Sequence, residues 1–234
     1  ALAFFGPVLF VLALASIVIG GVAAIGRPDL DGLLAHSSIS QLGFVVLPLA
    51  VAATLPSLRA LAVGAALVYI LNHGLAKALL YLISGTLQRD LGSDRFADLG
   101  GLAGRSPLLG GAFFIGALSL VGVPPLVGFF GKLFVFDTLG RAGAELALAG
   151  ALIGALLTIA YASRAWNRAF WGAQSPQVEQ FKPTAGLLGV VVALAVLVVL
   201  FGVLGDPVLE AAQAGASAAL DRSGYVTAVL EGSG

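Results

Sequence analysis

Long apolar stretches without charge dominate this chain and limit the environments in which it can fold. The stretch from Ala3 to Ile25 contains no Asp, Glu, Lys or Arg. Of the 234 residues, 59% are hydrophobic and 10% are charged, with a mean hydropathy of +1.03. An average soluble domain carries about 25% charged residues. The exterior of this fold must therefore face lipid, and an all-α transmembrane protein is predicted.

The charge balance and the missing residue types exclude several kinds of protein. Twelve basic residues balance twelve acidic ones, so nothing indicates a nucleic-acid partner. The absence of Cys excludes disulfides, thiolate metal sites and a cysteine nucleophile. The sequence shows no phosphate-binding glycine loop, metal cluster or nucleophile with its base, so no enzyme active site, metal or cofactor is expected. Because the chain starts at Ala1 and lacks Met, we expect the latter part of a longer protein.

A bilayer core about 30 Å thick needs roughly 20 apolar residues per helix, and this length divides the chain into seven segments. They are Phe4–Ile25, Leu33–Thr54, Ala60–Leu87, Pro107–Val123, Leu126–Leu139, Leu146–Trp171 and Thr184–Leu204. The hydrophilic loop 89–105 must lie outside the membrane, and Asp206–Gly234 is predicted to be a helical tail along its surface. Basic residues counted on alternate sides divide six against four, too evenly to predict the orientation.

The fifth segment is too short for a regular span and follows Pro124 and Pro125. It contains Gly128, Gly131 and Lys132, and irregular backbone at membrane depth survives only within protein or beside water. We therefore predict a broken helix. The resulting organisation is a first helix and turn (1–32), a five-helix unit (33–171), a loop with the last span (172–204) and a surface tail (205–234).

Lys77 lies near the middle of the third span, where a charge costs at least about 2.5 kcal/mol. His73, Tyr69, Tyr81 and Ser84 follow the three- and four-residue spacing that places them on the same helix face. Lys77 could instead snorkel to the interface, and His73 alone could be a satisfied core residue. Burial disfavours the ammonium form, so the two side chains together indicate a proton relay.

Two further polar groups interrupt the apolar pattern. Lys132 in the broken helix is followed by Asp137 and Arg141, which could form a pair that finishes the helix or could support the lysine. The segment HSSISQLG places Ser37, Ser40 and Gln41 near the start of the second span. These hydroxyls could cap helix-end amides or could hydrate a channel wall.

Three segments carry a resemblance to a known family. HSSISQLG, NHGLAKALLYLISG and GVPPLVGFFGK resemble, in order and spacing, motifs of the antiporter-like membrane subunits shared by respiratory complex I and Mrp-type sodium/proton antiporters. The third motif and the ending SGYVTAVL are most similar to the D subunit of Mrp antiporters. The resemblance covers almost the whole chain and identifies it as similar to the C-terminal half of such a subunit.

The resemblance implies a fold and a function. The fold is the second of two inverted five-helix repeats, with Lys77 similar to the central lysine of the proton path, Lys132 to the lysine at the broken helix, and His73 to the histidine beside Lys77. The expected function is proton translocation in a multisubunit Na⁺/H⁺ antiporter of the cell (inner) membrane, with other membrane subunits and lipid as partners.

Other functions stay open at this point. The same path would serve a proton-pumping subunit of a complex I-type NADH:quinone oxidoreductase, which would make the chain part of a translocase. The polar residues could also hold subunits together in a non-conducting scaffold. A retinal protein is disfavoured because its Schiff-base lysine belongs on the last helix, whereas Lys77 and Lys132 lie on the third and fifth segments.

Overall fold

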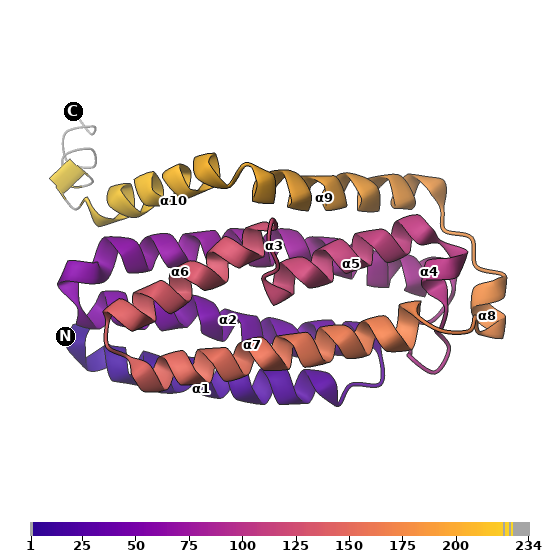
Figure 1. The fold of residues 1–234 in the computed structure, drawn as a ribbon, viewed down its shortest axis with the longest axis horizontal. Helices are drawn as coiled ribbons and strands as arrows, with labels where there is room; N and C mark the ends of the chain where they lie inside the picture. Colours follow the sequence, from indigo (N-terminus) through magenta and orange to yellow (C-terminus); the bar gives the residue numbers. More distant parts are fainter. Residues whose placement is uncertain (1, 222, 225, 227–234) are drawn as a thin grey trace.

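A computed structural model describes residues 2–221, 223, 224 and 226 as a bundle of α-helices (Figure 1). Within these residues no β-strand is found, and five helical segments are long and apolar enough to cross a membrane. Those segments are Phe4–Ile25, Leu30–Thr54, Pro56–Asp90, Glu145–Phe170 and Ala185–Val203. The predicted all-α transmembrane fold is confirmed.

Helices α1 (Leu2–Ile25) and α2 (Leu30–Thr54) form a tightly packed antiparallel pair. The Asp29 carboxylate caps α2 by accepting a hydrogen bond of 2.6 Å from the Gly32 amide. At Gly43, a β-carbon would come within 2.6 Å of a side-chain carbon of Ile17 on α1. The small residue therefore lets the two backbones approach closely.

The start of α2 corrects one of the sequence-based expectations. Because the helix begins at Leu30 rather than Leu33, HSSISQLG lies inside the helix instead of opening it. The hydroxyls of Ser37 and Ser38 donate to the carbonyl oxygen of Leu34 at 2.9 and 3.0 Å. They bond to carbonyls and do not cap amides, so the capping interpretation of this segment was wrong.

Helix α3 (Arg59–Asp90) follows a short 3₁₀ turn, η1 (Pro56–Leu58), and runs through the middle of the bundle (Figure 1). Its 32 residues give a length of about 48 Å at 1.5 Å per residue, which exceeds the bilayer core. It packs against α2, α5, α6, α9 and α10, so each polar residue on it can meet a different neighbour.

Helices α5 (Pro107–Val121) and α6 (Val127–Arg141) lie one after the other along the bundle (Figure 1). Gly122 ends α5 with a φ of +90°, a conformation that favours glycine, and its amide donates to Leu118 at 2.9 Å. The two predicted segments are therefore halves of one interrupted membrane crossing. The broken helix extends from residue 107 to 141, and treating the fourth segment as a separate span was wrong.

The chain returns through α7 (Glu145–Ala165), which continues into a π-helical turn, η2 (Trp166–Phe170). Two short helices, α4 (Leu102–Arg105) and α8 (Pro176–Glu179), lie in the hydrophilic loops at one end of the bundle.

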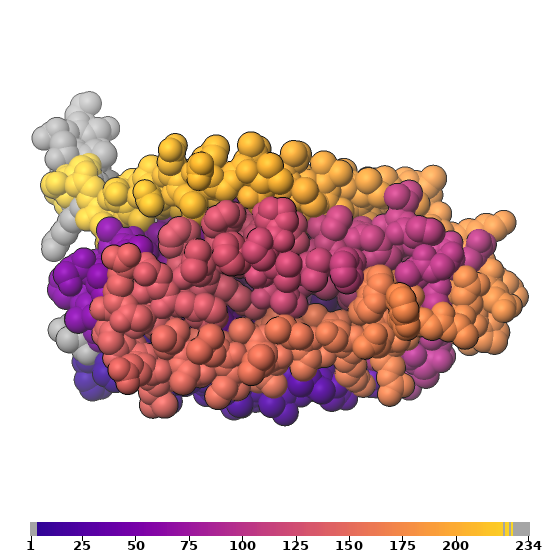
Figure 2. All heavy atoms as spheres, in the orientation of Figure 1, coloured from indigo at the N-terminus to yellow at the C-terminus, as the bar shows by residue number. Residues whose placement is uncertain are grey.

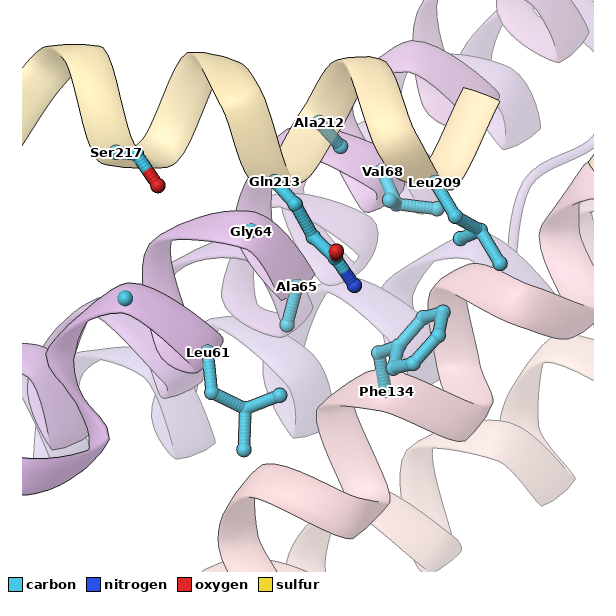
Figure 3. A pocket seen from close by; sticks show the side chains of 10 residues that line it. Leu61, Gly64, Ala65, Val68, Phe134, Leu209, Ala212, Gln213 and Ser217 are labelled. Atoms are coloured by element: carbon cyan, nitrogen blue, oxygen red, sulfur yellow. The ribbon is translucent and has the colours of Figure 1, made fainter. Parts of the chain in front are cut away.

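The last two helices, α9 (Ala185–Val203) and α10 (Gly205–Leu220), form a layer along one edge of the bundle (Figures 1 and 2). Helix α10 continues roughly in line with α9 and packs along α3, where Leu209 and Gln213 face Gly64 and Val68 (Figure 3). The predicted helix is therefore present in this part of the chain, where it lies against α3. The rest of the tail, including most of SGYVTAVL, lies outside the described residues.

The interrupted crossing also changes the distribution of basic residues between the two ends. One end of the bundle, here called the loop end, is formed by residues 26–29, 89–106 and 164–184 (Figure 1). The basic residues at the loop end are Arg27, Arg89, Arg95, Arg105, Arg164, Arg168 and Lys182. Among the described residues, the opposite end carries Arg59 and Arg141. The even count from sequence was wrong because it gave α5 and α6 a membrane crossing each.

Candidate functional site

Lys77 lies deep in the bundle and bonds to helix α2. Its side chain is buried, with 5% of the residue exposed, and its ammonium donates to the carbonyl oxygen of Leu34 at 2.8 Å. It also bonds to the Ser37 hydroxyl. The ring of Tyr81 lies 5.9 Å from the Lys77 nitrogen. The lysine is therefore held inside the bundle and does not snorkel to either end of its helix.

Lys132 is buried to the same degree, at 6% exposure, beside the break between α5 and α6. Its ammonium donates a hydrogen bond of 2.9 Å to the carbonyl oxygen of Val121, the last residue of α5. The same nitrogen lies 5.4 Å from the centre of the Phe44 ring on α2. A helix C-terminus and an aromatic face both attract a cation.

Neither buried lysine is neutralised by a carboxylate within the described part of the chain. The salt bridges found there join Arg89 to Asp90 and Arg141 to Asp137, toward the ends of helices α3 and α6. The groups around the two ammonium ions are carbonyl oxygens, a hydroxyl and aromatic rings. Such groups bind a cation without fixing it in an ion pair, and they also bind a neutral amine.

A buried hydrogen-bonded cluster, here called the Gln41 cluster, joins α2, α3 and α7. Tyr69 donates its hydroxyl to Gln41 Oε1 at 2.5 Å, and Gln41 Nε2 donates to Thr158 at 3.0 Å and to Tyr161 at 2.7 Å. Sequence reasoning singled out Gln41 and Tyr69 but missed Thr158 and Tyr161. Both missed residues lie on α7, 117 and 120 positions after Gln41, and no local spacing could have indicated the contact.

A second pair missed by sequence reasoning joins α3 to α5. Ser119 donates its hydroxyl to Asn72 Oδ1 at 2.6 Å, and Asn72 Nδ2 donates back to the Ser119 carbonyl at 3.4 Å. Both residues are buried. Asn72 could have been singled out from the sequence, because it is a polar residue directly before His73 and lies beside the polar stripe of α3.

The other residues of the stripe on α3 have different environments. His73 is half-buried, and within the described residues its Nδ1 atom is buried without a hydrogen-bond partner. The hydroxyl of Ser84 is likewise buried and unpaired there, whereas Tyr81 is 37% exposed. The members of the stripe therefore differ in exposure and in hydrogen bonding along the helix.

Two of the predicted supporting residues lie elsewhere. Ser40 donates its hydroxyl to the carbonyl oxygen of Ile17 at 2.9 Å and so ties α2 to α1. Asp137 pairs with Arg141 at 2.9 Å near the exposed end of α6. The structure therefore brings neither residue to the lysines, and the helix-finishing interpretation describes Asp137 correctly.

The residues of the helix break form the packing contacts that position Lys132. Gly128 lies directly against the carbonyl of Ser119, and a β-carbon there would overlap that oxygen. A β-carbon on Gly131 would lie 3.4 Å from the α-carbon of Tyr69. Pro124 and Pro125, joined by a cis peptide bond, lie in the connection between the two half-helices.

Family and sequence comparisons agree on the kind of protein to which this chain is similar. A family model for the transmembrane region of NADH:quinone oxidoreductase/Mrp antiporter proteins matches residues 2–158. The N subunit of the NADH-quinone oxidoreductase of Desulforudis audaxviator is 33% identical, covering 85% of this chain and 41% of the relative. The D subunit of the Na⁺/H⁺ antiporter of Alkalihalophilus pseudofirmus is 32% identical, covering 95% and 44%. The chain therefore spans less than half the length of these relatives.

Solved structures show the same similarity. A chain of the Mrp complex from Dietzia sp. superimposes with a TM-score of 0.87 at 26% identity, covering 97% of this chain and 49% of that one. A chain of respiratory complex I from Thermus thermophilus with bound NADH gives a TM-score of 0.79 at 26% identity, covering 92% and 45%.

Proposed function

Because the chain belongs to the NADH:quinone oxidoreductase/Mrp antiporter transmembrane family, we propose that it is a proton-translocating membrane subunit of a multisubunit Na⁺/H⁺ antiporter in the cell membrane. The Mrp complex of Dietzia sp., which covers 97% of this chain, supports the antiporter assignment. Its partners are then other membrane subunits of the complex and the surrounding lipid.

The observation that carries the proposal is the pair of buried lysines without a carboxylate partner in the described residues. An ammonium at bilayer depth costs at least about 2.5 kcal/mol, and proteins retain such a group where it serves transport or binding. A lysine amine that donates to carbonyl oxygens can keep the same position in its protonated and in its neutral form. Lys77 and Lys132 are therefore suited to take up and release protons in turn.

Other residues would support this exchange. His73 lies one helical turn before Lys77, and its Nδ1, which has no hydrogen-bond partner among the described residues, can accept a proton in the tautomer that carries its hydrogen on Nε2. Ser37 contacts the Lys77 ammonium directly and can reorient its hydroxyl as the lysine gains or loses a proton. Helix α2 thus contributes to the environment of both lysines, through Ser37 at one and Phe44 at the other.

The test is cation/proton exchange by the complete complex in proteoliposomes, with Lys77→Ala and Lys132→Ala compared with wild type. Both variants should lose Na⁺-driven proton movement while the complex keeps its subunit composition. The matched control is Lys182→Ala, which removes an exposed lysine from the loop end and should leave exchange unchanged. Exchange at the wild-type rate in both variants would contradict the proposal, and loss of assembly before loss of transport would favour a structural scaffold.

A second candidate is a proton-pumping subunit of a complex I-type oxidoreductase. The 33% identity to the N subunit of Desulforudis audaxviator and the match to Thermus thermophilus complex I favour it. The same lysines would act, driven by a redox partner. Purifying the complex and identifying its other subunits separates the two candidates, because a complex I-type assembly contains redox subunits and reduces quinone.

A further inference from the structure

The side chain of Gln41 lies on the face of α2 that contacts both lysines. Ser37, one helical turn before Gln41, bonds to Lys77, and Phe44, about one turn after it, lies beneath Lys132. On α3, Tyr69 of the Gln41 cluster lies eight residues before Lys77, about 12 Å along the helix. Gln41 is therefore placed between the two amines along this face.

The amide of Gln41 has no free hydrogen-bonding hydrogen. Its Oε1 accepts from Tyr69, and its Nε2 donates to both Thr158 and Tyr161. An amide nitrogen carries two hydrogens, so both are used. Gln41, Tyr69 and Thr158 are 0% exposed and Tyr161 is 1% exposed. The cluster is fully buried and fixes the orientation of the amide.

The chemistry of an amide differs from that of the hydroxyls around it. A hydroxyl or water can accept one proton and release another, which moves charge along a chain of hydrogen bonds. A carboxamide neither releases its N–H protons nor holds an added proton near neutral pH, so it ends such a chain. The branch through Thr158 also ends, because its hydroxyl donates to the backbone carbonyl of Gly154 at 2.8 Å.

We propose that the Gln41 amide interrupts proton transfer between Lys77 and Lys132 as long as its hydrogen bonds to Tyr69, Thr158 and Tyr161 are intact. The inference rests on the proposed function and adds a reason why proton movement is tightly coupled to movement of the cation. With the amide in place, protons do not pass from one lysine to the other. Protons therefore do not cross the subunit unless the coupled cation also moves. Transfer between the lysines then requires the cluster to open.

The test replaces the amide by side chains that can relay protons. Gln41→Glu is nearly isosteric, and the hydroxyls of Tyr69, Thr158 and Tyr161 can rotate to donate to a carboxylate. Gln41→His offers a second relay group of different shape. In proteoliposomes containing the complete complex, with a pH gradient and no Na⁺, both variants should pass protons severalfold faster than wild type. Leak rates follow from a pH-sensitive dye trapped inside.

Two controls separate proton relay from loosened packing. Gln180→Glu makes the same chemical change at an exposed site in the loop that follows α8 and should not leak. Ser40→Ala removes a buried hydrogen bond between α2 and α1 beside Gln41 but leaves the cluster intact, and it should also retain the wild-type leak rate. Wild-type leak rates in both Gln41 variants, or an equal leak in Ser40→Ala, would overturn the inference. Failure of the wild-type complex to exchange Na⁺ for protons would instead contradict the proposed function.

Discussion

The ammonium of Lys132 donates a hydrogen bond of 2.9 Å to the carbonyl oxygen of Val121, and this contact joins the two halves of the interrupted helix. A cation at a helix C-terminus gains about 0.3–1 kcal/mol, and up to about 2 kcal/mol when partly buried. A charge at the bilayer centre costs at least about 2.5 kcal/mol. The helix end therefore offsets only part of the cost, and the face of the Phe44 ring, water or release of the proton supplies the remainder.

The close contact at Gly128 predicts that the break tolerates no side chain there. In Gly128→Ala the new methyl group would overlap the carbonyl of Ser119 and separate α5 from α6. Overpacking of this kind costs about 1–3 kcal/mol. We expect a lower thermal midpoint of the purified complex and reduced exchange.

The matched control for that variant is Gly140→Ala on the same helix, where no atom lies within 4 Å of the added carbon. It should be neutral or stabilising by up to about 1 kcal/mol, because alanine favours the helix. A Gly128→Ala complex as stable as the Gly140→Ala complex would show that the two half-helices can move apart without cost.

The Asp137–Arg141 pair should contribute little to stability or transport. The side chains are 36% and 63% exposed, and exposed pairs contribute about 0–1 kcal/mol. Asp137→Asn should therefore keep the exchange rate and shift the thermal midpoint slightly. A loss of exchange in this variant, with assembly intact, would indicate that Asp137 takes part in the proton path.

The uneven distribution of basic residues predicts the orientation in the membrane. Cytoplasmic loops carry an excess of Lys and Arg, so the loop end should face the cytoplasm. These 234 residues contain no Cys, so labelling of an introduced cysteine can be followed on the peptide that carries it by mass spectrometry. In intact cells a membrane-impermeant thiol reagent should label Glu145→Cys at the opposite end but not Gln180→Cys in the loops. The reverse labelling pattern would contradict the assignment.

Some of the site could be predicted from the sequence because lipid penalises charge so strongly. Lys77 and Lys132 stand out in apolar segments, and the spacing of Tyr69 and His73 places them on the same helix as Lys77. The long apolar runs likewise indicate α1, α2, α3, α7 and α9. These are local signals, and the helical period is enough to interpret them.

The rest of the fold and of the candidate site depends on contacts between residues that are far apart in the sequence. Hydropathy describes α5 and α6 as two apolar pieces, but it cannot show that they share one crossing, since their direction is set at Gly122 and by packing on α3. Thr158 on α7 looks like an ordinary polar residue until the fold places it against Gln41. The position of α10 along α3 likewise follows from tertiary packing.

Proton transfer through positions 77 and 132 requires amines there that water can reach, and chemical rescue tests this requirement most directly. Lys77→Cys and Lys132→Cys should each abolish exchange. Treatment with 2-bromoethylamine then rebuilds a lysine-like amine at the cysteine, and mass spectrometry of the chain verifies the modification. We predict that exchange returns after aminoethylation but not after ethylation with a neutral reagent. Full exchange by the unmodified cysteine variants, or equal recovery with the neutral ethyl group, would contradict proton transfer through these lysines.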